Sequence, residues 1–97
     1  MSEAPASIIA LTVIFHLDGC RSLKERRGRL GGLRERFGRN PRIALVEHPG
    51  DDPQASRWTF LILGQDPRAT ADLADGVARD LEMRVDAVVA DFVREIL

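Results

Sequence analysis

The chain contains one cysteine, Cys20, so no disulfide can form within it, and a reducing, cytoplasmic location is expected. It has no tyrosine and only five aromatic residues, so it has few side chains from which a base-stacking surface could be built. Its longest apolar run, residues 8–17, is interrupted by Thr12 and His16 and is too short to span a bilayer, so no membrane association is expected. Residues 1–6 carry no basic segment ahead of an apolar run, and no signal peptide is expected.

The rest of the composition is that of an ordinary globular protein, with 44% hydrophobic and 30% charged residues. A length of 97 residues predicts a single domain, 1–97, because a second hydrophobic core would not fit. The net charge of −1 argues against a general polyanion binder. However, residues 21–42 hold nine Lys or Arg against two Glu, a local charge of +7, and the rest of the chain carries −8. This asymmetry predicts that a partner docks on the basic segment.

Two helix starts are visible in the sequence. Ser22 followed by Glu25 has the spacing of a capping box, and Asp66 followed by Pro67 is a good N-cap before a favoured first helical residue. Turn residues separate these helices from apolar, β-branched stretches that predict strands. In chain order, the predicted elements are strand 7–17, helix 22–37, strand 42–48, strand 58–63, a helix from Asp66 through Leu81, and strand 85–93 with a short tail to Leu97.

This order, βαββαβ, predicts an α+β fold of the ferredoxin-like kind. Its four-stranded antiparallel sheet is expected to have the spatial order 4-1-3-2, with both helices on one face. The predicted buried stripe of the first helix is Leu23, Leu30, Leu33 and Phe37. The predicted core face of the first strand is Ile9, Leu11, Val13, Phe15 and Leu17. Other small α+β arrangements remain as alternatives.

The first and third strands are apolar on both faces, which is unusual for a sheet that helices cover on one side only. In strand 58–63, one face carries Trp58, Phe60 and Ile62, and the other carries Thr59, Leu61 and Leu63. A second copy packed sheet to sheet would cover the surplus apolar face, so we expect a homodimer. The expected dimer face comprises Thr12, Ile14, Trp58, Phe60 and Ile62.

The predicted first strand is followed by the run Gly19-Cys20-Arg21-Ser22-Leu23-Lys24-Glu25-Arg26-Arg27. This run resembles a signature of the bacterial YlxP-like family, Gly-x-x-Ser-Leu-Lys-x-Lys-Arg. Val46-Glu47-His48 and Arg94-Glu95-Ile96-Leu97 resemble further parts of that family, whereas the polar loop that follows its His is replaced here by residues 49–58. The resemblance implies a ferredoxin-like domain of unknown function. Genes of this family often lie beside those for translation initiation and ribosome-binding factors, so it also implies an RNA- or ribosome-linked role.

The candidate binding residues are the exposed and flanking cations of the first helix: Arg21, Lys24, Arg27, Arg29, Arg34 and Arg36. Such a cluster can bind phosphates by charge and by bidentate guanidinium contacts. Alternatively, the acidic exterior of the second helix neutralises these cations, and they form an ordinary solvated face. Arg26 falls inside the apolar stripe, so we interpret it as structural, either extending past Leu30 to solvent or pairing with a partly buried carboxylate.

Other chemistry has less support in the sequence. Trp58 and Phe60 are aromatic, but segment 57–63 lacks the glycines of RNA-recognition sheets, so a core or dimer role is favoured. Ligand-type residues gather near one end of the predicted sheet without metal-ligand spacing: His16, Cys20, Glu47, His48, Asp51 and Asp52. No Gly-rich phosphate loop is present. We expect no catalytic residues, no metal, no cofactor and no small-molecule substrate.

These observations lead to one hypothesis and one alternative. The hypothesis is a non-enzymatic cytoplasmic protein, dimeric, that contacts RNA or a ribosomal surface through its basic first helix. The alternative is a dimeric protein–protein adaptor or ligand-sensing module without a nucleic-acid role, in which the same helix docks an acidic protein.

Overall fold

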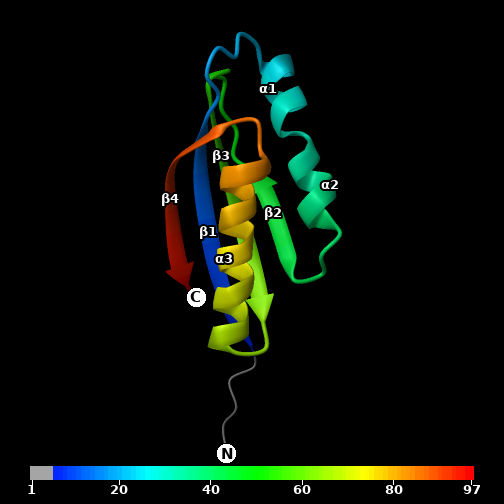
Figure 1. The fold of residues 1–97 in the computed structure, drawn as a ribbon, viewed down its shortest axis with the longest axis vertical. Coiled ribbons are helices and arrows are strands. Elements are labelled where there is room, and N and C mark those ends of the chain that lie inside the picture. The colour runs from blue at the N-terminus through cyan, green and yellow to red at the C-terminus, as the bar shows by residue number, and fades with distance from the viewer. Residues whose placement is uncertain (1–5) are drawn as a thin grey trace, which may run out of the picture.

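A computed structural model describes residues 6–97, and Figure 1 shows its fold. The elements are β1 (Ser7–His16), α1 (Leu23–Leu30), α2 (Gly32–Gly38), β2 (Ile43–Glu47), β3 (Ala55–Gly64), α3 (Pro67–Arg84) and β4 (Val88–Ile96). The strands form one antiparallel sheet in the order β2-β3-β1-β4, and the helices pack on one of its faces (Figure 1). The predicted ferredoxin-like fold and strand order are confirmed. The expectation about a signal peptide falls on residues 1–5, outside the described residues.

The core lies between the helices and one face of the sheet. Val13 of β1 lies opposite Trp58 of β3, and Leu11 lies opposite Phe60, so these side chains share the helix-covered face. Helices contribute Leu30, Leu33 and Phe37 from α1 and α2, and Thr70, Ala74, Val77 and Leu81 from α3. The predicted core face of strand one and stripe of the first helix are confirmed, except that Leu23 is only half-buried.

This register shows that part of the predicted dimer face is wrong. Trp58, Phe60 and Ile62 are each at most 2% exposed beneath the helices and cannot meet a second copy. Thr12 and Ile14 lie on the opposite, uncovered face, where their β3 partners are Thr59 and Arg57. Both faces of strand three are apolar, and only pairing with strand one shows which of them is the core.

Several element boundaries differ from the prediction. The first helix is interrupted at Gly31, which separates α1 from α2. An added Cβ at Gly31 would lie 2.7 Å from the carbonyl oxygen of Arg27, so this break favours glycine. Strand three begins earlier than predicted, at Ala55, because it pairs with β1 along the whole length of both strands. Strand four runs from Val88 to Ile96 rather than from 85 to 93, since residues 85–87 form the connection from α3.

Two glycines with open space around them are expected to respond oppositely to an added methyl group. Gly28 lies exposed in α1, and a Cβ there meets nothing within 4 Å, so Gly28→Ala should raise the free energy of unfolding by about 1 kcal/mol through helix propensity. Gly19 has equally open space but a φ of +72°, and Gly19→Ala should lower that free energy. Urea unfolding of both variants measures the difference, and a destabilised Gly28→Ala variant would contradict the helical assignment.

No helix within residues 6–97 is long and apolar enough to cross a membrane.

Candidate binding surface on the first helices

The predicted capping box places the first cations at the start of α1. The Ser22 hydroxyl oxygen accepts a hydrogen bond from the Glu25 amide at 3.0 Å, and the Glu25 carboxylate accepts one from the Arg21 amide at 2.8 Å. The Ser22 bond is that of the predicted capping box, whereas Glu25 reaches the amide of Arg21 instead of that of the N-cap residue Ser22; both bonds fix where the helix begins. Arg21 therefore stands just before the first turn, and Lys24 stands within it.

Three of the six predicted cations form a free cluster, which we call the basic patch: Arg21, Lys24 and Arg27. All three are exposed, and their side chains make no hydrogen bond or ion pair with any residue that the structure describes. Lys24 and Arg27 are three residues apart on one helix, so they lie on neighbouring positions of its surface. Exposed Gly28 lies next to them in α1 without a side chain, which leaves backbone accessible beside the charges.

Two other predicted cations are tied to acidic partners. The Arg29 guanidinium forms an ion pair with Asp86 at 3.2 Å and donates to the backbone carbonyls of Asp86 and Asp18, both at 2.9 Å. Arg36 forms an ion pair with Asp80 of α3 at 3.0 Å. These two side chains hold the first helices against neighbouring elements. Only the Arg36–Asp80 pair is the neutralisation by the second predicted helix that the alternative interpretation expected, because Asp86 follows the end of α3.

Arg34 has an intermediate position. Its guanidinium carbon lies 5.6 Å from the centre of the Trp58 ring, and its nearest carboxylate, that of Glu47, is 3.9 Å away. The side chain remains 66% exposed. Arg34 therefore covers an edge of the core and can still contact a ligand on the outer surface.

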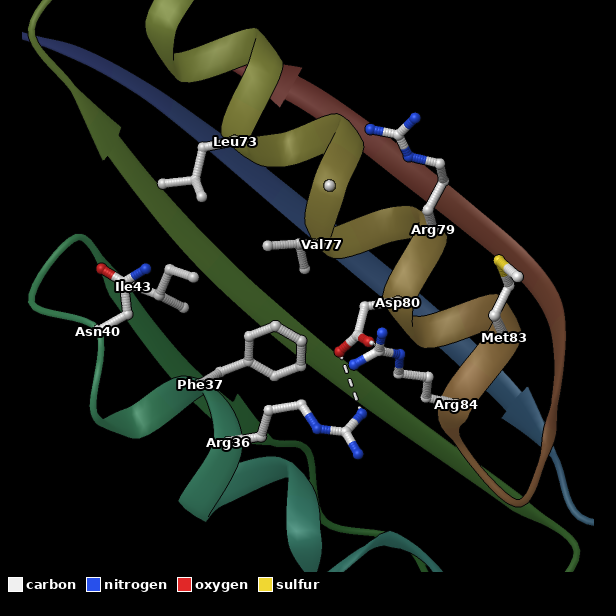
Figure 2. Close-up of a pocket in the computed structure, with 11 residues that line it drawn as sticks. Arg36, Phe37, Asn40, Ile43, Leu73, Val77, Arg79, Asp80, Met83 and Arg84 are labelled. Carbon is white, nitrogen blue, oxygen red and sulfur yellow. Dashed lines mark hydrogen bonds and ion pairs between the residues drawn. The ribbon is translucent and has the colours of Figure 1, made fainter.

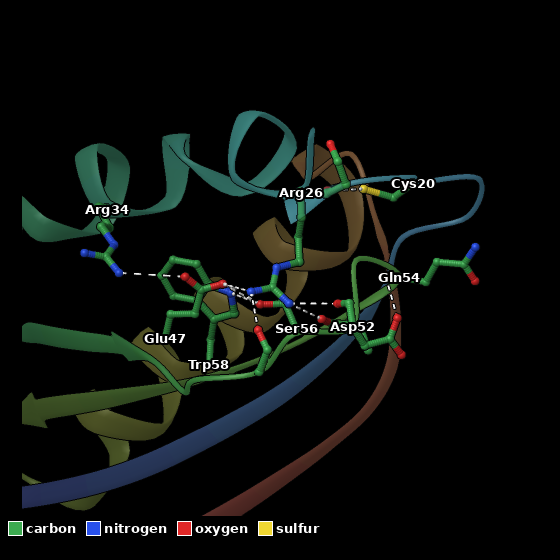
Figure 3. A network of polar contacts seen from close by, with 11 residues as sticks. Cys20, Arg26, Arg34, Glu47, Asp52, Gln54, Ser56 and Trp58 are labelled. Atoms are coloured by element: carbon green, nitrogen blue, oxygen red, sulfur yellow. Dashed lines mark hydrogen bonds and ion pairs between the residues drawn. The ribbon is translucent and has the colours of Figure 1, made fainter. Parts of the chain in front are cut away.

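Arg26, the one buried cation of α1, joins this helix to the β2–β3 loop (Figure 3). Its guanidinium donates to the carbonyl oxygens of Asp52 at 2.8 Å, Ala55 at 2.9 Å and Gly50 at 3.0 Å, and it lies 3.8 Å from the Glu47 carboxylate. The structural role predicted for Arg26 agrees with this geometry. The loop that it holds could not be identified from the sequence.

A groove of about 590 Å³ between α2 and α3 was missed by the sequence reasoning (Figure 2). Phe37, Ile43, Leu73 and Val77 supply its apolar side chains, and Arg36, Arg79 and Arg84 lie around it. Asp80 pairs with both Arg36 and Arg84, at 3.0 and 3.3 Å, so two of the three guanidinium groups share a single carboxylate. The sequence signal for this groove was the mixture of positive and negative residues at 79–84. Only the acidic residues of this helix were taken into account in the sequence analysis, and they were interpreted as its exterior.

The ligand-type residues near the loop end of the sheet do not form a metal centre. Cys20 is buried, and its thiol lies 3.5 Å from the Ser22 carbonyl oxygen. The His48 ring nitrogen Nε2 lies 2.7 Å from the Thr59 hydroxyl, and Glu47 accepts a hydrogen bond from Ser56. Within residues 6–97, no three His, Cys, Asp or Glu side chains are arranged to hold a metal ion.

Comparison with known proteins gives one match. The family model described as "Protein of unknown function (DUF503)" matches residues 8–94, which include every helix and almost every strand residue of the fold. No curated protein matches this chain.

Proposed function

Because this chain belongs to the DUF503 family, whose description assigns no function, we propose from its surface that it is a non-enzymatic RNA-contacting protein. The proposed contact is between the basic patch and the phosphates of structured RNA, such as a ribosomal surface. The proposal includes a cytoplasmic location and a YlxP-like identity within the family. The run from Gly19 to Arg27 supports that identity.

The observation that carries this proposal is the absence of intramolecular partners for Arg21, Lys24 and Arg27 among the described residues. Elsewhere on these helices the chain supplies carboxylates, namely Asp86 for Arg29 and Asp80 for Arg36. Three exposed cations within seven residues at a helix start repel one another, and phosphate groups would relieve that repulsion. The side chains would contact backbone phosphates rather than base edges, so binding without sequence preference is expected.

Binding to purified ribosomal RNA across a salt series tests the proposal. The logarithm of the wild-type binding constant should fall linearly with the logarithm of salt concentration. Replacing Arg21, Lys24 and Arg27 together with Ala should remove about two to three units of that slope, since each phosphate contact contributes about 0.7 to 0.9. Between about 50 and about 200 mM salt, this part of the slope corresponds to about thirtyfold in affinity.

A matched control separates a local site from a general charge effect. Replacing Arg68, Arg79 and Arg84 of α3 with Ala removes the same number of charges from exposed positions on another helix. This control should bind with the wild-type slope. Equal losses in the two triple variants would contradict a localised site, and the absence of wild-type binding at low salt would reject the RNA proposal.

The alternative function, an adaptor that docks an acidic protein, predicts a different result in the same experiment. An acidic protein surface binds through the same side chains but releases no condensed counterions from a polyanion. Two results together would favour the adaptor. The wild-type chain would not bind RNA, and an acidic protein that co-purifies with the wild-type chain would not co-purify with the variant that lacks the basic patch.

A further inference from the structure

The sheet face opposite the helices, which we call the open face, is an exposed apolar surface. Its exposed large side chains come from all four strands, with exposed fractions from 38% to 61%: Ile14, Val46, Leu61, Leu63, Val88 and Val93. Small residues, Ala10 and Ala44, lie between them, opposite or beside Leu61. Exposed apolar side chains gathered on one face of a sheet are typical of interaction surfaces. The open face therefore has the character of an interface.

The polar groups at the centre of the open face are already paired within the chain. The hydroxyl oxygens of Thr12 and Thr59 lie 2.9 Å apart, and the His48 ring nitrogen lies 2.7 Å from the Thr59 hydroxyl. This hydrogen-bonded chain crosses from β1 over β3 to the end of β2. Removing water from Thr12, Thr59 and His48 costs little free energy, because these side chains keep their hydrogen bonds to one another.

Charges on the open face are divided by side. Arg42, His48 and Arg57 lie along β2 and β3, whereas Asp91 and Glu95 lie on β4 at the other edge. Arg57 and Asp91 are both partners of Ile14, so one positive and one negative group flank the same apolar side chain. The face is thus basic on one side and acidic on the other, with apolar side chains and the paired Thr12 and Thr59 between them.

We propose that a second copy of this chain covers the open face, related by a two-fold axis parallel to the strands. This axis stacks β1 of each copy on β3 of the other copy, and β2 of each copy on β4 of the other. It places the acidic β4 side of each copy over the basic β2–β3 side of the other, near His48 and Arg57. An axis perpendicular to the strands would instead stack β4 on β4 and bring Asp91 close to Glu95 of the other copy. Charge complementarity therefore selects the first arrangement.

The size of the open face is sufficient for a stable pair. Four strands about 4.8 Å apart span about 19 Å, and β1, with ten residues, is about 33 Å long. Because β2 has only five residues, aligned stacking would bury about 500 Å² on each copy, or about 1,000 Å² in total, which exceeds the area of most nonspecific contacts. The helices then form the two outer layers, and each basic patch remains exposed.

Sedimentation analysis of the purified full chain tests the interface without any RNA, so its outcome is independent of the proposed function. Wild-type protein should sediment as a dimer, and Leu61→Asp should sediment as a monomer because it introduces a charge at the centre of the face. Met83→Asp is the matched control, since Met83 is 81% exposed on α3 at the helix side. It should remain dimeric. A monomeric wild type or a dimeric Leu61→Asp variant would overturn the proposal.

A charge-exchange experiment tests the arrangement of the two copies. Arg57→Glu places an acidic group on each side of Ile14, and Asp91→Arg places a basic group on each side of it, so each variant alone should sediment as a monomer. An equimolar mixture should form a heterodimer, because the two acidic groups of one copy then meet the two basic groups of the other. Recovery of the pair also shows that both variants are folded. Variants that stay dimeric alone, or that fail to pair when mixed, would overturn the two-fold arrangement.

Discussion

Replacing Arg26 with Met is expected to lower the free energy of unfolding by about 3 kcal/mol. Met preserves the apolar stem that packs beneath α1 but removes the guanidinium. Three carbonyl oxygens of the β2–β3 segment, those of Gly50, Asp52 and Ala55, lose a charged donor. At about 1 kcal/mol for each lost bond, these three contacts account for the expected change.

Glu47 adds to this loss but does not dominate it. Its side chain is 19% exposed, and it keeps the Ser56 hydroxyl at 2.8 Å and the Arg34 guanidinium at 3.9 Å after Arg26 is removed. The carboxylate therefore keeps some of the interactions that stabilise its charge. Its loss of Arg26 should lower the free energy of unfolding by less than the loss of the only partner of a buried charge would. Arg26 therefore stabilises the protein mainly through its hydrogen bonds to the backbone of the loop, and only secondarily through the ion pair.

Two controls separate these contributions in urea unfolding. Arg26→Lys keeps the positive charge near Glu47 but loses the planar fork that reaches three carbonyls, so about half of the loss should remain. Arg34→Met removes a cation that is 66% exposed and should change the free energy of unfolding by less than about 1 kcal/mol. If Arg26→Met proved no more destabilising than Arg34→Met, the loop would not depend on α1.

The fold could be predicted from the sequence because several local signals agree. Ser22 with Glu25, and Asp66 with Pro67, mark the helix starts at the positions that the structure shows. The alternation in β1 assigned its buried face correctly, since His16 and Thr12 interrupt only the other face. Consistent signals at caps, turns and apolar stripes leave few topologies for a short chain.

The contacts that define the candidate site could not be predicted, because they join residues far apart in the chain. Arg29 and Asp86, or Arg36 and Asp80, are separated by dozens of residues, and only the packing of α3 brings each pair together. Composition alone therefore could not divide the six predicted cations into free and paired groups. The core face of β3 had the same limitation, since Trp58 and Leu61 are both apolar and only the register with β1 distinguishes them.

The second large effect is expected at Gly64, where Gly64→Ala should lower the free energy of unfolding by about 3 kcal/mol. The predicted third strand ends at residue 63, just before Gly64. In the structure it is buried, and an added Cβ would overlap the Thr70 hydroxyl oxygen and lie 2.8 Å from the Thr70 amide nitrogen and 2.9 Å from its Cα. Two of these atoms belong to the backbone of α3, so the end of β3 and the first turn of α3 would have to separate.

Thr70 cannot move away without losing other contacts. Its hydroxyl lies 2.7 Å from the Asp66 carbonyl oxygen and 3.3 Å from that of Ser7, and its amide donates to Asp66 at 3.1 Å within the first turn. The same turn is capped by Asp66, which accepts from the Ala69 amide at 2.8 Å. A displaced Thr70 would therefore disturb the cap of α3 and its attachment to β1.

A double variant distinguishes a backbone clash from a side-chain clash. If only the Thr70 hydroxyl opposed the new methyl group, Gly64→Ala combined with Thr70→Ala would recover most of the stability lost by Gly64→Ala alone. Because the amide nitrogen and Cα are also within 3 Å of the added Cβ, little recovery is expected in urea unfolding relative to Thr70→Ala alone. Strong recovery would show that α3 approaches β3 less closely than described. Failure to recover would establish that glycine is required here for the packing of α3 against the sheet, which also positions Asp80 opposite Arg36.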